Sequence, residues 1–147
     1  MWQAIISCSQ FHHTCFDKEV YTRMVKCCVQ LKQYTQAAVL SQLFEEPDYM
    51  ATFKYLQEKE SHDGMDIYYD YLWDINIMEY LIHLHDKRGE LDKKQQLITI
   101  ISNPEINTNN PEPILQTCRS QKTAKFFDYC ANNMVTRLNH SAFLFDL

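Results

Sequence analysis

Glycine and proline are scarce in this chain: of its 147 residues, 2 are glycine and 4 are proline. Folds rich in turns need both residues in number, so their scarcity speaks against a β-rich protein and favours long, uninterrupted helices. The two glycines, Gly64 and Gly89, are isolated from each other. The sequence therefore contains neither a phosphate-binding loop nor a dinucleotide-binding fingerprint.

Long apolar runs, basic stripes and Cys-x-x-Cys motifs are missing as well. No apolar run approaches about 20 residues, the length that a membrane-spanning helix needs, and no signal peptide opens the sequence. The net charge of −5 is spread along the chain. Its densest basic run, Lys87-Arg88 with Lys93 and Lys94 nearby, is typical of a solvated helix end. We therefore expect no membrane span, no direct nucleic-acid contact and no structural zinc site.

The composition is that of one globular domain, with 46% apolar and 22% charged residues. Six cysteines are present, but Cys27 and Cys28 are adjacent, and Cys118 and Cys130 lie far from them. This placement does not fit a disulfide framework. It predicts reduced, mostly buried thiols in an intracellular protein.

Apolar spacing predicts helices along most of the chain. Val20, Met24, Cys27 and Leu31 recur at the helical period, and Asp17 precedes them as an N-cap. A second helix is expected from a cap at Thr35 to a stop at Pro47, and Asn110-Pro111-Glu112 is expected to start another. Further helices are expected over residues 48–59, 65–86, 91–102 and 122–138.

The segment of residues 65–86 is the most apolar of these and is apolar nearly all round. We expect one central helix there, buried on several sides and followed by Gly89 as a C-cap. Residues 2–6 also have a helical pattern but no cap before them, which suggests a piece of a longer chain. The expected organisation is one helical domain, residues 1–138, followed by a tail, residues 139–147.

Two parts of the chain resemble each other. In one, a helix ends, the chain turns, and Tyr34 begins a helix that is followed 13 residues later by Pro47; in the other, Leu91 and Pro104 have the same spacing. The two copies are 57 residues apart. The pattern is similar to the turn of a tetratricopeptide repeat, in which paired helices stack because one pair cannot bury its own apolar face. We predict an all-α fold of TPR-like antiparallel hairpins stacked as a short α-solenoid.

Candidate site residues are few. His62, Asp63, Asp66 and Asp70 have spacings that place the three carboxylates on one helical face, where they could hold a hard cation. A solvated acidic face with Asp63 as a helix cap explains the same spacing, and we prefer it. We therefore expect no catalytic residue, no cofactor and no metal. The candidate contact surface for a partner consists of Asp63, Asp66, Asp70, Lys93 and Lys94.

A block of aromatic and acidic residues, Ser61-His62-Asp63-Gly64-Met65-Asp66-Ile67-Tyr68-Tyr69-Asp70-Tyr71-Leu72-Trp73-Asp74, resembles the C-terminal region of the Integrator complex subunit 8 family. The resemblance extends over roughly residues 4–115. It implies a nuclear, non-catalytic scaffold or adaptor that supports small nuclear RNA 3′-end processing and attenuation of RNA polymerase II transcription. The implied location includes association with chromosomes. The implied partners are other Integrator subunits, protein phosphatase 2A and, indirectly, RNA polymerase II.

The sequence leaves two other functions open as alternatives to this one. A generic TPR adaptor for a peptide tail would need basic clamp residues in its groove, for which Arg88, Lys93 and Lys94 are the candidates. A metal-dependent enzyme would be centred on Asp63, Asp66 and Asp70.

Overall fold

The computed structural model describes residues 17–145, and every regular element in that range is helical. The helix expected over residues 2–6 lies outside the described residues. The elements are α2 (Lys18–Gln30), α3 (Tyr34–Ser41), α4 (Tyr49–Gln57), η1 (Met65–Tyr71), α5 (Ile75–Arg88), α6 (Leu91–Ile101), η2 (Pro104–Ile106) and α7 (Glu112–Phe145), where η marks a 3₁₀-helix.

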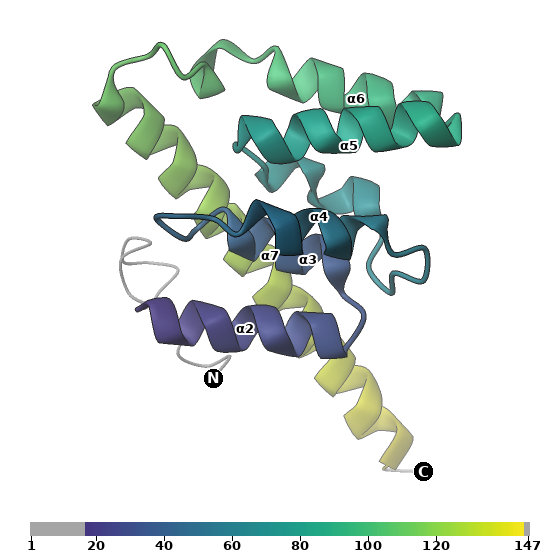
Figure 1. The fold of residues 1–147 in the computed structure, drawn as a ribbon. Helices are drawn as coiled ribbons and strands as arrows, with labels where there is room; N and C mark the ends of the chain where they lie inside the picture. The colour runs from purple at the N-terminus through teal and green to yellow at the C-terminus, as the bar shows by residue number, and fades with distance from the viewer. Residues whose placement is uncertain (1–16, 146–147) are drawn as a thin grey trace.

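The helices α2 to α6 are stacked in chain order, each in contact with the next (Figure 1). The long helix α7 crosses this stack diagonally and contacts η1 and η2. The 3₁₀-helix η1 also touches α3 and α6, so it lies between the stack and α7. This arrangement confirms the prediction of an all-helical, TPR-like solenoid.

The two predicted repeat turns have the same backbone structure. In each, a residue just beyond the helix adopts a left-handed conformation: Lys32, two residues after α2, has φ 56°, and Gly89, which directly follows α5, has φ 71°. The next amide donates to a carbonyl five residues back, from Gln33 to Cys28 at 2.8 Å and from Glu90 to His85 at 2.9 Å. Lys32 and Gly89 each donate to the carbonyl three residues back, at 3.1 Å in both turns. Both turns are therefore Schellman motifs, with the 57-residue offset read from the sequence.

The predicted single central helix over residues 65–86 is wrong. The chain forms η1, then becomes extended at Leu72 (ψ 140°), and α5 starts afresh after Asp74, whose side chain accepts from Ile77 N at 3.1 Å. Aspartate is a favoured N-cap residue, and Asp74 is the residue in the sequence that indicates a new helix start within the apolar run.

A side chain from α3's C-terminal end stabilises the break. Gln42 is buried; its amide group donates to the Tyr71 carbonyl at 2.8 Å, and its oxygen accepts from Trp73 N at 3.0 Å and Asp74 N at 3.3 Å. These backbone groups have left the helical hydrogen-bond pattern and would otherwise lack partners. One glutamine thus takes over the hydrogen bonds that a continuous helix would have made.

Other helix boundaries also differ from expectation. The helix begun near Thr35 ends at Ser41, well before Pro47, and Thr35 lies inside it rather than capping it. The start signal at Asn110-Pro111-Glu112 is confirmed, but the helix that begins there is one continuous element to Phe145, without a break at residue 139. The division into a domain and a tail stays a prediction.

The core contains side chains from every helix of the stack and from α7. The largest fully buried ones are Leu40, Leu56, Tyr69, Leu72, Ile77, Met78, Leu81, His85, Leu97 and Phe126. On α2 the buried face is Tyr21, Met24 and Cys28, so the expected face is rotated by about one residue. Of the described cysteines, Cys28, Cys118 and Cys130 are buried, whereas Cys27 is exposed.

Substituting the residue with positive φ in each turn tests whether the two turns are equivalent. Gly89→Ala should lower the free energy of unfolding by about 1–2 kcal/mol, because a side chain is disfavoured at positive φ although space is available around the new Cβ. Lys32→Gly should raise the melting temperature by about 2–4 °C by relieving the same strain. Thermal melts followed by circular dichroism measure both. A loss of stability in Lys32→Gly would contradict this account.

Candidate interaction site

Asp63 is the residue whose position differs most from expectation. It is 8% exposed, and its carboxylate accepts from the backbone amides of Thr35 at 3.2 Å and Gln36 at 2.7 Å, and from the Ser61 hydroxyl. These amides belong to the first turn of α3, which favours a negative charge. Asp63 therefore caps α3, a helix earlier in the chain, and is not available on a surface. Its predicted role as the cap of the following helix is wrong.

The chain around Asp63 is fastened to the first repeat turn. His62 N donates to the Lys32 carbonyl at 2.8 Å, and Lys32 Nζ lies 2.9 Å from Glu60 Oε2. These bonds hold residues 60–63 across the turn between α2 and α3. Residues 60–63, which we call the strap, therefore join α4 to the first hairpin.

Beside the strap lies a buried polar cluster. Gln36 Nε2 donates to the Tyr68 hydroxyl at 2.9 Å. Burial raises the pKa of the Cys28 and Cys130 thiols to about 12, so both remain protonated and unreactive at neutral pH. Thr35 Oγ1 is buried without a hydrogen-bond partner among the described residues. The cluster is part of the core.

Asp66 and Asp70 are exposed on η1. It is their backbone carbonyls that make tertiary contacts: Asp66 O accepts from Gln96 Nε2 at 3.2 Å and Asp70 O from Lys122 Nζ at 2.6 Å. Across the described residues, no three His, Cys, Asp or Glu side chains are grouped closely enough to hold a metal ion. The carboxylates of Asp63, Asp66 and Asp70 are therefore not brought together.

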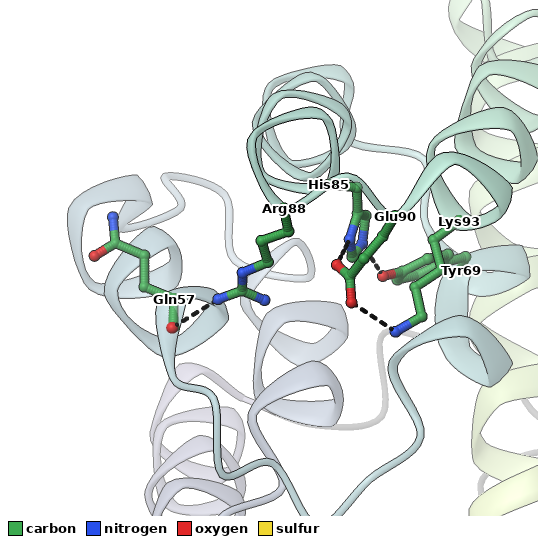
Figure 2. A network of polar contacts seen from close by, with 6 residues as sticks. All are labelled: Gln57, Tyr69, His85, Arg88, Glu90 and Lys93. Atoms are coloured by element: carbon green, nitrogen blue, oxygen red, sulfur yellow. Dashed lines mark hydrogen bonds and ion pairs between the residues drawn. The ribbon is translucent and has the colours of Figure 1, made fainter.

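The basic candidates are each engaged by the chain itself. Lys93 Nζ lies 3.3 Å from Glu90, Lys94 Nζ lies 2.6 Å from Asp86, and Arg88 donates to the Gln57 carbonyl at 2.9 Å. Figure 2 shows Arg88, Glu90 and Lys93 at the turn between α5 and α6. As candidate contact residues, Asp66, Asp70, Lys93 and Lys94 remain predictions.

The structure reveals a buried polar network that the sequence reading missed (Figure 2). His85 is 0% exposed; its Nδ1 lies 2.6 Å from Glu90 Oε2 and its Nε2 lies 2.5 Å from the Tyr69 hydroxyl. A neutral ring with its proton on Nδ1 satisfies both contacts, since it donates to the carboxylate and accepts from the phenol. The network joins η1 to both ends of the second repeat turn. His85 follows Met78 and Leu81 at helical spacing, and that periodicity was the signal for its burial.

A groove of about 780 Å³ opens where α7 diverges from α6. Its lining combines Ile100 and Tyr71 with charged residues of both signs, among them Glu105, Lys122 and Asp128. Burial lowers the pKa of the Lys122 ammonium, which donates to the Asp70 carbonyl. A groove of this size suits a peptide segment, and the sequence reading had not predicted it.

Within the described part of the chain, none of the helices combines the length and hydrophobicity needed to cross a bilayer.

Two stacked hairpins with Schellman turns and an open groove define a TPR-like helical-repeat protein. A family model described as INTS8, TPR repeats matches residues 3–133. The chain belongs to this family, that of Integrator complex subunit 8.

Individual relatives agree with the family match. Integrator complex subunit 8 of Xenopus laevis is 48% identical over 134 residues, and that of Homo sapiens is 47% identical over the same length. Each alignment covers 88% of this chain. The Integrator complex subunit 8-like protein of Dictyostelium discoideum is 30% identical over 113 residues, which is 76% of this chain and 57% of that protein. The chain spans 14% of the length of the frog and human relatives.

Removing the Asp63 carboxylate tests its role as a remote cap. Asp63→Ala should lower the free energy of unfolding by about 1–3 kcal/mol, because two amides of α3 lose their buried acceptor. Asp66→Ala, which removes an exposed carboxylate three residues later, should change it by less than about 0.5 kcal/mol. Urea unfolding of the two variants provides the comparison. Equal effects would show that Asp63 does not stabilise the fold through α3.

The network at His85 predicts an acid-sensitive contribution to stability. The hydrogen bond from His85 lowers the pKa of Glu90 below its ordinary value of 4.5. A lowered carboxyl pKa stabilises the fold above pH 4.5, and that contribution is lost as the pH falls through the lowered value. Urea unfolding at pH 6 and at pH 3 measures this contribution. Between these two values, the free energy of unfolding of Glu90→Gln should fall by less than that of the wild type. Parallel pH profiles would contradict this assignment.

Proposed function

We propose that this chain is a non-catalytic assembly module of the Integrator complex. The observation that carries the proposal is the family match over residues 3–133, together with relatives named as Integrator complex subunit 8. The partners are then other Integrator subunits, and the module acts in the nucleus. Its biological role is to support small nuclear RNA 3′-end processing and attenuation of RNA polymerase II transcription, with a link to recruitment of protein phosphatase 2A.

Several features support a scaffold rather than an enzyme. Three of the buried polar side chains, Asp63, Gln42 and His85, make hydrogen bonds that hold helices together. Stacked helical pairs expose long faces and grooves, and such surfaces suit protein binding. The groove between α6 and α7, with charges of both signs, is one such surface. Asp70 lies at its edge and is the candidate contact residue closest to it.

The generic peptide-binding adaptor is less well supported. Its clamp would require Arg88, Lys93 and Lys94 to offer their charges to a ligand, and each instead has a partner on its own chain. The lysines that line the groove between α6 and α7 are Lys122 and Lys125, both on α7.

Affinity capture from human nuclear extract tests the proposal. The tagged chain serves as bait, and quantitative mass spectrometry measures the enrichment of Integrator subunits and of phosphatase 2A subunits. Enrichment of Integrator subunits is the expected result. Enrichment of phosphatase 2A in the same fraction would support the finer role as well, whereas enrichment of neither would contradict the proposal that this segment makes an assembly contact.

A matched pair of variants locates the contact. Lys125→Glu reverses an exposed charge in the groove, and Lys87→Glu reverses an exposed charge on α5, away from it. Both should fold as the wild type does, since neither side chain is buried. If the groove carries the contact, Lys125→Glu should reduce the enrichment severalfold and Lys87→Glu should not.

A further inference from the structure

The groove between α6 and α7 continues beyond its main hollow. A second hollow of about 340 Å³ adjoins it toward the start of α7, and the two share Glu105, Cys118 and Gln121 in their linings. Together they follow α7 from Ile114 to Asn132. At about 1.5 Å per helical residue, this stretch is roughly 27 Å long, or about five helical turns. A surface of that length suits a whole segment of a partner rather than a single side chain.

One straight face of α7 forms a wall of this groove. Its residues follow one another at alternating steps of four and three and are Ile114, Cys118, Gln121, Lys125, Asp128 and Asn132. Alternating steps of this kind form the seam along which a second helix packs in a coiled coil. The face is apolar at one end, where Ile114 is 48% exposed, and polar at the other.

Two opposite charges on this face are available to a partner. Lys125 and Asp128 are both exposed and lie three residues apart on α7. Among the described residues, neither side chain takes part in a hydrogen bond or an ion pair. Glu90 and Lys93 have the same spacing and do pair, at 3.3 Å. The groove therefore presents an ammonium and a carboxylate in a fixed order, with the ammonium nearer to its apolar end.

The walls of the groove favour a helix as the occupant. Its lining comes from α6, α7, η1 and the segment around η2, and helices bond most of their own backbone groups internally. Within residues 17–145 the chain forms no strand, so the groove has no sheet edge to which an extended peptide could add. A segment bound there has to satisfy its own amides and carbonyls, as an α-helix does.

We propose that this groove binds one α-helix of a partner protein, with a carboxylate facing Lys125 and a basic side chain facing Asp128. An apolar side chain of the same helix enters the hollow beside Ile114. Because Lys125 lies between Ile114 and Asp128, the acidic residue of the bound helix lies between its apolar and its basic residue. This order is the same whichever way the helix runs along the groove.

The inference rests on the proposed role of the groove as an assembly contact and adds the chemistry of what it binds. The opposite charges provide specificity, since a helix with the two charges exchanged would place like charges together at both positions. The apolar hollow fixes the register of the helix along α7.

Peptide selection with two baits tests the predicted order. A displayed library of random peptides of about 20 residues, long enough to span the groove as a helix, is selected against the wild-type chain and against Lys125→Glu/Asp128→Lys. The double variant keeps the net charge and changes two exposed side chains, so it should melt as the wild type does. We expect the acidic residue to lie between the apolar and basic residues in peptides selected by the wild type, and the basic residue to take that place in peptides selected by the variant. The same pattern from both baits would overturn the proposal.

A peptide selected by the wild type then provides a binding measurement. Its dissociation constant, from fluorescence anisotropy, should rise at least tenfold with Lys125→Glu/Asp128→Lys. The matched control is Glu79→Lys/Lys87→Glu, which exchanges two exposed charges on α5, outside the groove, and should leave the constant unchanged. Circular dichroism should show a gain of helix on binding. A peptide that stays extended when bound, or that binds all three proteins equally, would overturn the proposal.

The outcomes separate this inference from the proposed function. If affinity capture enriches Integrator subunits while no selected peptide distinguishes the wild type from the groove variant, the assembly role stands and the helix-binding groove is overturned. If the selection gives the expected order while capture enriches no Integrator subunit, the groove binds a helix as proposed and the assembly role is overturned.

Discussion

Each of the two helical hairpins has more apolar surface than its own two helices can bury, and the rest of the structure depends on how that surface is covered. On α5, one side packs against α6 and another against α4. The remaining exposed side of the stack is closed by η1 and by α7, which brings Phe126 and Phe127 into the core. Burial of these side chains is the dominant favourable contribution to folding, and it fixes the order of the helices.

The same arrangement leaves backbone groups to be satisfied wherever the chain leaves a helix. Side chains from distant segments perform this task. Asp63 accepts from the first turn of α3, Gln42 bonds the break between η1 and α5, and Asn110 donates to the Pro104 carbonyl at 2.7 Å before α7 begins. Because unpaired buried amides and carbonyls are costly, these residues are structural, although their polar chemistry resembles that of functional sites. The groove between α6 and α7 is the surface that we propose for a contact with a partner.

The sequence reading succeeded where the signal was local. The cap at Asp17, the left-handed Gly89 and the start before Glu112 all depend on residues within one helical turn. It failed at the break after Tyr71, since apolar residues continue through the break and only Asp74 marks it. It also failed for Asp63, whose partners lie 27 and 28 residues earlier in the chain. Spacing along one helix cannot reveal a carboxylate that caps another.

By itself, the sequence determined the class of fold, the repeat and its family, because helical periodicity, turn residues and a long similar segment are properties of the chain alone. Only the tertiary structure decided which polar side chains are buried and which apolar face is exposed. Cys27 and Cys28 are neighbours in sequence, yet one is exposed and the other buried. Neighbouring residues of a helix point in different directions, so the thiol that is buried is decided by where the other helices pack against α2.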